Sequence, residues 1–255
     1  MKTLFIGRNI IRLTEVGSTN SYANTMLKSL KIPEGTIVWA DYQSEGRGQR
    51  GSVWIAEPAA NITCSLIITP LFLNAENHFL ISKIIALAIK RALADILTSS
   101  NYDIKIKWPN DILVNNKKIA GILIENSIKN SQIINSIIGF GINVNQTNFA
   151  ELSKKACSLK TLINNEFDKQ LLFNKVCEHF EALYLQLKSS KYKEINEAYL
   201  HDLLFYNKAV IYTEVANSQA FEGKITEVTE DGKISILLIT GEIKKYEMKE
   251  ISFEY

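Results

Sequence analysis

The longest helical pattern in the chain constrains the fold more than any other feature. It runs from about residue 74 to 97, and its apolar residues form a wide stripe that a sheet must cover. The strands for such a sheet follow directly, as apolar segments over about residues 104–108, 112–114, 119–125 and 133–144. The sequence therefore predicts an α+β domain in which helices pack on a sheet.

The regions on either side add further elements. Apolar residues spaced at helical intervals from Tyr22 to Leu30 predict a short helix, which Ser18, Thr19 or Asn20 could cap. Further strands are expected over residues 36–40 and 62–69, a hairpin turn over 115–117, and helices over about 168–187 and 191–199.

The sequence pattern changes after Tyr206, to short and closely spaced apolar segments. Short strands are expected over residues 209–213, 221–228, 233–239 and 243–248, with glycine-containing turns between them. About fifty residues of closely spaced strands indicate a small barrel or sandwich. We therefore divide the chain into a larger domain, residues 1–206, and a β-rich domain, residues 207–255.

Charge and cysteine content exclude several classes of protein. The chain has 29 Lys and Arg against 27 Asp and Glu, so it has no general electrostatic reason to bind DNA or an anionic membrane. Its three cysteines form no C-x-x-C pair, which argues against a disulfide framework or a zinc site. It contains no apolar run of about 18 residues, and its N-terminus does not resemble a signal peptide. We expect a cytoplasmic protein with reduced thiols.

The first segment that suggests a functional site is the loop Gly46-Arg47-Gly48-Gln49-Arg50-Gly51. Its glycines let successive backbone N–H groups turn toward an anion, and two guanidinium groups suit phosphate. The pattern fits neither a Walker A loop nor a dinucleotide-binding G-x-G-x-x-G. The alternative interpretation is a flexible surface turn with two solvated arginines.

Three further segments place polar or small residues at strand ends or inside apolar strands. Lys107-Trp108-Pro109-Asn110-Asp111 holds Lys, Asn and Asp on a rigid turn, although a plain Asn-Asp turn beside a buried Trp explains it as well. Gly121, within the strand that begins near Lys118, indicates close approach by a ligand or a backbone. In Gly139–Asn145, strand alternation would put Asn143 and Asn145 on one face, where a ligand or a neighbouring loop would have to satisfy them.

In this order and spacing, the motifs resemble those of the biotin protein ligases. The resemblance covers essentially the whole chain, from Ser18-Thr19-Asn20 through the loop at 43–54 to Gly141-Ile142-Asn143. It implies a mixed sheet flanked by helices, similar to class II aminoacyl-tRNA synthetase cores, and a C-terminal SH3-like barrel. It also implies a ligase that joins biotin to ATP as biotinyl-adenylate, and then transfers biotin to a lysine of a biotin carboxyl carrier protein.

The resemblance also assigns roles to individual residues. Those expected to bind biotin are Ser18, Thr19, Gln43, Gly46, Arg47, Lys118 and Gly121. Those expected to bind ATP or the adenylate are Arg47, Gly48, Arg50, Trp54, Lys107, Asn110, Lys118 and Asn143. Arg47, Lys118 and Asp111 are the expected catalytic residues, and Asp111 would orient the carrier lysine or accept its proton. Asn20 is expected to cap the helix rather than to touch a ligand. No protein ligand for a metal is assigned, since Mg²⁺ would be bridged by the nucleotide phosphates.

Two positions depart from the family pattern. Gln49 and Ser52 stand where many relatives carry basic residues, so this loop has less positive charge. About seventeen residues precede the first motif, too few for a DNA-binding helix-turn-helix, which predicts a monofunctional ligase that does not bind DNA. The apolar stretch from Ile133 to Ile138 is expected to be an edge strand that pairs with a second copy, as a homodimer, or with the carrier.

Two other functions remain open at this point. A lipoate or octanoate ligase shares the expected core fold, although the R-R-x-x-G-G-G loop typical of that family is not present. A non-enzymatic RNA-binding module would use residues 46–51 and the small barrel, but no stacking aromatic residues are interleaved with that motif.

Overall fold

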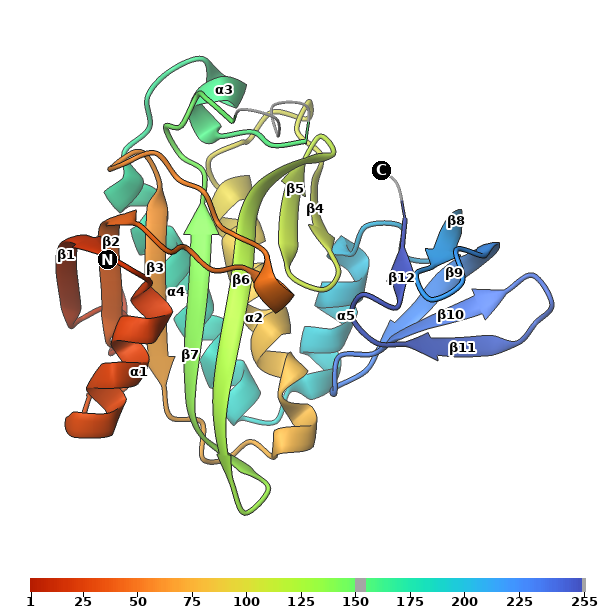
Figure 1. Ribbon diagram of the computed structural model, residues 1–255, viewed down its shortest axis with the longest axis horizontal. Coiled ribbons are helices and arrows are strands. Elements are labelled where there is room, and N and C mark those ends of the chain that lie inside the picture. The colour runs from red at the N-terminus through yellow and green to blue at the C-terminus, as the bar shows by residue number, and fades with distance from the viewer. Residues whose placement is uncertain (150–154, 254–255) are drawn as a thin grey trace.

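The computed structural model describes residues 1–149 and 155–253, with all of their side chains except that of Arg50. The larger sheet has seven strands in the order β1-β2-β3-β7-β6-β5-β4 (Figure 1). They are β1 (Ile10–Val16), β2 (Ile37–Gln43), β3 (Ile62–Ile68), β4 (Ile104–Lys107), β5 (Asp111–Val114), β6 (Lys117–Lys129) and β7 (Gln132–Ile142). β1 and β2 are parallel and the other neighbours antiparallel, which confirms the predicted mixed sheet.

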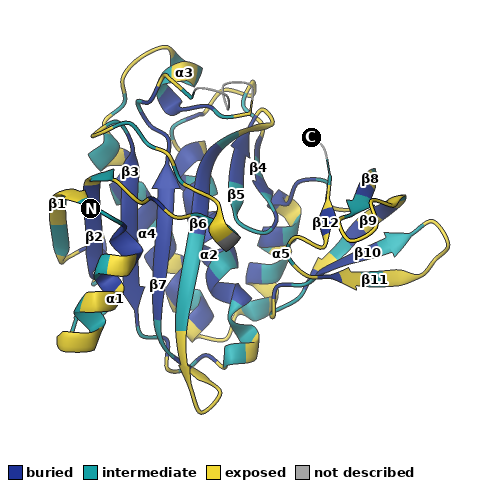
Figure 2. Cartoon of the chain, in the orientation of Figure 1, coloured by how far each residue is buried: buried dark blue, intermediate teal, exposed yellow. Residues whose placement is uncertain are grey.

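Helices cover both faces of this sheet. On one face lie α2 (Phe79–Ala94), α4 (Lys169–Lys188) and α5 (Tyr192–Asp202), and on the other lies α1 (Thr19–Ser29) (Figure 1). The broad apolar face of α2 is almost wholly buried (Figure 2), as its sequence predicts. The remaining helical segments are α3 (Leu159–Ile163) and two 3-10 turns, Gln49–Gly51 and Ala75–Asn77.

Two apolar cores hold these layers together. The large core lies between the sheet and α2, α4 and α5, and it extends into the C-terminal strands. A small second core lies under α1, where Ala23 packs with Val38, Ile67 and Ile137 from three neighbouring strands. Because residues alternate along a strand, β2, β3 and β7 contribute side chains to both cores.

The prediction that residues 133–138 form an edge strand is wrong. These residues belong to β7, which pairs with β3 on one side and β6 on the other, so the strand lies inside the sheet. A strand buried on both faces shows the continuous apolar run seen here, whereas an edge strand usually carries charges that prevent pairing. The sheet ends instead at β1 and β4.

The C-terminal strands form a second, antiparallel sheet in the order β11-β10-β9-β8-β12. They are β8 (Ala209–Glu214), β9 (Ala220–Val228), β10 (Ile234–Leu238), β11 (Ile243–Tyr246) and β12 (Ile251–Ser252). This sheet is consistent with the expected SH3-like barrel. Its β9–β10 turn docks on the larger domain, where Trp108 Nε1 donates to the Gly232 carbonyl at 3.0 Å. Among the described helices, none is both long and apolar enough to cross a bilayer.

Candidate active site

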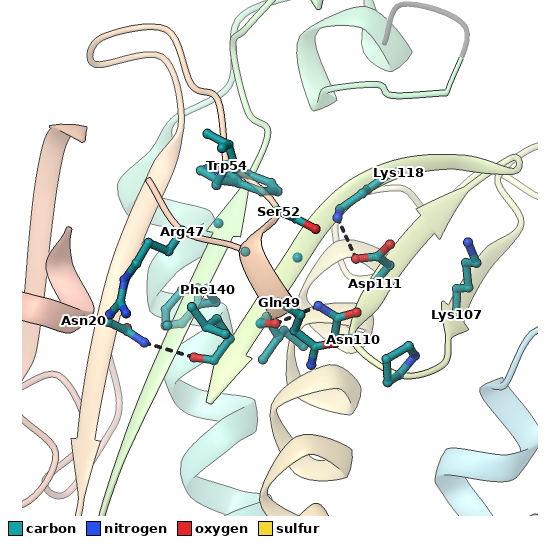
Figure 3. A pocket seen from close by; sticks show the side chains of 18 of the residues that line it. Asn20, Arg47, Gln49, Ser52, Trp54, Lys107, Asn110, Asp111, Lys118 and Phe140 are labelled. Atoms are coloured by element: carbon teal, nitrogen blue, oxygen red, sulfur yellow. Dashed lines mark hydrogen bonds and ion pairs between the residues drawn. The ribbon is translucent and has the colours of Figure 1, made fainter. Parts of the chain in front are cut away.

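The four sequence motifs meet around one cavity of about 320 Å³. It lies beside the N-terminus of α1 and over the first half of β6 and the last part of β7, under the loop that joins β2 to β3 (Figure 3). Eleven of the predicted site residues line it: Ser18, Thr19, Gln43, Arg47, Gly48, Trp54, Lys107, Asn110, Asp111, Lys118 and Gly121. A volume of this size is typical of sites for small organic ligands.

The floor of the cavity is made by glycines on adjacent strands. Gly121 of β6 pairs with Gly141 of β7, and the indole ring of Trp54 lies over both. A Cβ built on Gly141 would come within 2.3 Å of the ring, and one on Gly121 within 3.1 Å. The close approach predicted at Gly121 is therefore found, and its immediate partners are Trp54 and the end of Lys118.

Trp54 is held in place by the loop itself. Its backbone N–H donates to the Gly46 carbonyl at 2.9 Å, while Gly48 N–H donates to the Ser52 carbonyl at 2.7 Å. The indole N–H is buried, and it donates to no group among the described residues. A buried donor of this kind favours a ligand that supplies an acceptor.

One end of the cavity holds a lysine and a carboxylate. Lys118 Nζ lies 2.7 Å from Asp111 Oδ1 and 5.6 Å from the centre of the Trp54 ring. The turn that carries Asp111 is fixed by Asn110, whose amide donates to the Ile122 carbonyl at 2.9 Å and whose carbonyl accepts from Ile122 N–H at 3.0 Å. These contacts fix the turn against β6, so Asp111 is held within reach of Lys118.

The other end holds an arginine and polar side chains. Arg47 Nη2 donates to Glu125 Oε2 at 3.0 Å. Thr19 donates from its backbone N–H and its hydroxyl to Gln43 Oε1, at 2.8 and 3.0 Å. The cavity thus runs from a hydrogen-bonding end near Gln43 to a cationic end at Lys118.

Burial also shifts the pKa of two side chains in the cavity wall. Burial lowers the pKa of Lys107, with Asp111 opposing the shift and Lys118 and Lys155 adding to it. Burial raises the pKa of the Cys64 thiol well above its usual value. Cys64 therefore stays a thiol at neutral pH, which makes it a poor nucleophile.

The remaining predicted site residues do not line the cavity, or have a side chain that the structure does not describe. Gly46 does not line the cavity but allows the loop to close, because a Cβ there would meet the Trp54 carbonyl at 2.3 Å. Asn143 lies just past the end of β7, away from the cavity, and its amide donates to the Cys157 carbonyl at 3.0 Å. The side chain of Arg50 is outside the described part of the chain.

The prediction for Asn20 is wrong. It is the second residue of α1, its side chain does not cap the helix, and it lines the cavity. The residue at the cap position is Ser18, which makes no side-chain cap hydrogen bond. Asn20 instead donates to Glu125 Oε2 at 2.7 Å and accepts from Ser65 Oγ at 2.6 Å.

Other lining residues are absent from the sequence-based expectations. The C-terminal segment contributes Lys249, Ile251, Ser252 and Phe253, and β7 contributes Gly139 and Phe140. The glycines at 139 and 141 share one strand face, which is a signal that the alternation of β7 could have revealed. The contribution of the C-terminal segment could not be predicted, because residue 249 is far along the chain from the other lining residues and only the fold brings it to the cavity.

Comparison with known proteins identifies the family. Residues 13–143, just over half of the chain, match the biotin/lipoate A/B protein ligase family. The bifunctional ligase/repressor BirA of Bacillus spizizenii is 33% identical over 187 residues, which cover 72% of this chain and 56% of that protein. The chain thus spans little more than half the length of this relative.

Solved structures extend the likeness to almost the entire chain. The biotin protein ligase from Aquifex aeolicus, in complex with biotin and ATP, is 27% identical with a TM-score of 0.77. The alignment covers 97% of this chain and 99% of that one. The chain belongs to the biotin/lipoate A/B protein ligase family.

Proposed function

We propose that the chain attaches biotin to a lysine of a biotin carboxyl carrier protein, using ATP and a biotinyl-adenylate intermediate. One observation carries this proposal: a single cavity has the polar groups of Thr19 and Gln43 and the cation Arg47 at one end and the cation Lys118 at the other. A ligand with a polar head, an apolar middle and an anionic tail matches that order. The likeness to a ligase solved with biotin and ATP supports it.

The roles of the residues in adenylation follow from their chemistry. Ser18, Thr19 and Gln43 would bind the ureido group of biotin, and Gly121 would lie beside its rings, next to Trp54 and Lys118. Arg47 and Lys118, which lie toward different ends of the cavity in this structure, would meet the biotin carboxylate and the α-phosphate of ATP and offset the charge that develops there. Gly48, Arg50, Trp54, Lys107 and Asn110 would surround the nucleotide, whereas Asn143, predicted to do so, lies away from the cavity.

Magnesium fits this arrangement as part of the nucleotide substrate. Among the described residues there is no group of three or more His, Cys, Asp or Glu that could hold a metal ion. As a companion of ATP, Mg²⁺ would be held mainly by the phosphates, where it supplies charge neutralisation. Asp111 is a carboxylate in the cavity lining, 2.7 Å from Lys118 Nζ.

In the second half-reaction, the carrier lysine would attack the acyl carbon of biotinyl-adenylate and release AMP. The attacking amine must lose a proton, and Asp111 is placed to orient it or to accept that proton. These steps would be carried by residues 1–206, with residues 207–255 as the appended SH3-like barrel. The buried free cysteines are typical of a reducing compartment, so we place the enzyme in the cytoplasm.

The carrier needs a docking place close to the cavity, and β6 offers one. β5 pairs with β6 only as far as Gly121, and residues 123–129 pair with β7 on one side alone within the described chain. A slot of about 240 Å³ follows this open edge and shares Gln49, Asn110, Ile122 and Leu123 with the main cavity. An extended segment of the carrier, or a second copy of the chain in a homodimer, would add to the edge as a strand.

A proline at Ile124 tests this docking place. Ile122 directs its N–H and carbonyl to Asn110, so Ile124, two residues along, directs its own toward the same edge. Ile124→Pro should slow transfer to the carrier and leave adenylation intact. Equal loss of both half-reactions would place the carrier elsewhere.

Pyrophosphate exchange into ATP tests the proposed function directly. The assay contains Mg²⁺ and either biotin, lipoate or no acid. Exchange with biotin alone supports biotin adenylation, and transfer to a purified carrier domain would complete the reaction. Exchange with lipoate alone would assign the chain to the lipoate ligases. Nucleic-acid binding with a steep salt dependence, without exchange, would favour an RNA-binding module.

A further inference from the structure

We propose that Glu125 is a positioning residue that sets the orientation of Arg47 and links it to the buried polar side chains at the same end of the cavity. The inference rests on the proposed function, because it gives Arg47 its role. Glu125 lies on β6, four residues after Gly121, so its side chain projects from the same face of the strand. Its Oε2 atom accepts hydrogen bonds from the loop after β2 and from α1.

Two donors from different elements converge on that oxygen. Arg47 Nη2, from the loop after β2, donates to Glu125 Oε2 at 3.0 Å. Asn20 Nδ2, from α1, donates to the same atom at 2.7 Å. In Figure 3 the Arg47 side chain extends from the loop toward Asn20.

Asn20 is itself fixed on all sides. It is 3% exposed, and its Oδ1 accepts from Ser65 Oγ at 2.6 Å. Its side chain lies so close to β7 that a Cβ on Gly139 would meet Oδ1 at 2.4 Å. The Asn20 amide therefore has one orientation, with Nδ2 toward Glu125 and Oδ1 toward Ser65.

The chain of contacts continues to the other polar side chains at this end of the cavity. Ser65 Oγ also lies 2.7 Å from Thr19 Oγ1, which donates to Gln43 Oε1 at 3.0 Å. A chain of contacts thus leads from Gln43 to Arg47 through the buried side chains of Thr19, Ser65 and Asn20 and the half-exposed Glu125, with two hydroxyl protons shared among the three contacts that the two hydroxyls make. A ligand bound at Gln43 and Thr19 is held by the same network that orients the arginine.

The geometry points to orientation rather than to competition with the substrate. A guanidinium group carries five N–H donors, and the recorded contact with Glu125 uses Nη2 alone. Arg47 and Glu125 side chains are 44% and 40% exposed, so their ion pair adds little to stability. Its main effect is to hold a long, flexible side chain where an anion will arrive.

A double-mutant cycle tests this role. Glu125→Ala should lower the rate of biotin-dependent exchange by about tenfold, because Arg47 loses its orientation. In a chain that already carries Arg47→Ala, Glu125→Ala should change the rate by less than about twofold. The control is Asp95→Ala, since Asp95 forms a similarly exposed pair with Lys175 at 3.0 Å and is not among the residues that line the cavity.

A second measurement does not depend on activity. Trypsin cleaves after arginine, so release of Arg47 should make Glu125→Ala several-fold more sensitive within the loop, whereas Asp95→Ala should not change. Three results would each overturn the inference. They are losses of exchange rate that simply add in the double variant, faster exchange in Glu125→Ala than in the native chain, and unchanged proteolysis of Glu125→Ala. Lack of any biotin-dependent exchange in the unaltered chain would instead contradict the proposed function, and proteolysis would still test the contact.

Discussion

The indole ring of Trp54 lies directly against the backbone of Gly141. A Cβ at position 141 would lie 2.3 Å from Cε2 of the ring and 2.5 Å from Cζ2, distances at which atoms cannot coexist. The position of the whole loop that carries Trp54 therefore depends on a missing side chain in β7. The same ring stands over the floor on which the substrate is proposed to bind.

Gly141→Ala should displace Trp54 and open the loop. We expect biotin-dependent exchange to fall by more than about tenfold, with a change in tryptophan fluorescence. Gly121→Ala is the matched control: its Cβ would meet Trp54 and the flexible end of Lys118 at 3.1 to 3.2 Å, so a smaller loss is expected. A Gly141→Ala variant with normal exchange would show that the ring need not occupy this position.

The elements with regular apolar spacing were predictable from the sequence. The α2 stripe, the strands at β3 and β6, and the turn at Asn115 and Asn116 all lie where expected, and both asparagines adopt the predicted left-handed conformation, with φ of 49° and 60°. Local composition was sufficient there, since burial periodicity and turn chemistry depend on neighbours in the chain.

Other features depend on contacts between distant segments. β1 was not predicted, because most of its residues are only partly buried and its pattern of burial does not alternate. Asn20 was read as a cap because asparagine favours that position, yet its partners Ser65 and Glu125 lie 45 and 105 residues away. Such pairings can be found only after the sheet order is known.

Arg47→Ala should reduce adenylate formation by well over tenfold, because it removes the guanidinium proposed to offset charge at the α-phosphate. The rate of adenylate formation in Arg47→Lys should lie between those of the native chain and Arg47→Ala, since an ammonium keeps the charge but loses the planar donor geometry. Pyrophosphate exchange at saturating ATP measures both. Unchanged exchange in Arg47→Ala would remove this residue from the mechanism.

Asp111→Asn should separate the two half-reactions. The substitution removes the carboxylate that lies 2.7 Å from Lys118 and that is proposed to handle the carrier lysine. We expect transfer from preformed biotinyl-adenylate to fall by about a hundredfold, within the range for loss of a general base, and exchange to fall less. A larger loss in exchange than in transfer would instead assign Asp111 to adenylation.

Gln49→Arg should slow the release of biotinyl-adenylate. Gln49 lines the cavity at a position where the loop has less positive charge than is typical of the family. An added guanidinium would attract the adenylate phosphate, and we expect several-fold slower dissociation after removal of free ligand. Gln49→Glu is the opposite control and should speed release. Equal release rates in both variants would show that this side chain does not sense the phosphate.

Lys83 should make stability depend on pH in the alkaline range. It is 1% exposed between α2 and the C-terminal sheet, and Nζ donates to Asn196 Oδ1 at 2.8 Å and to the Val228 carbonyl at 2.5 Å. Burial lowers its pKa from 10.5 to about 8, against the opposing effects of Glu230, Glu227 and Asp231.

Between these two values the unfolded chain holds a proton at Lys83 that the folded chain has lost, so rising pH favours the folded state there and has no such effect below about 8. Urea unfolding at pH 7, 8.5 and 10 should show the free energy of unfolding of the native chain rising relative to that of Lys83→Met across this range. Lys90→Met is the control, because Lys90 lies on the same helix as Lys83 but is partly exposed, and it pairs with Asp202 of α5. A difference between native chain and Lys83→Met that stays constant with pH would mean that Lys83 keeps its ordinary pKa in the folded protein.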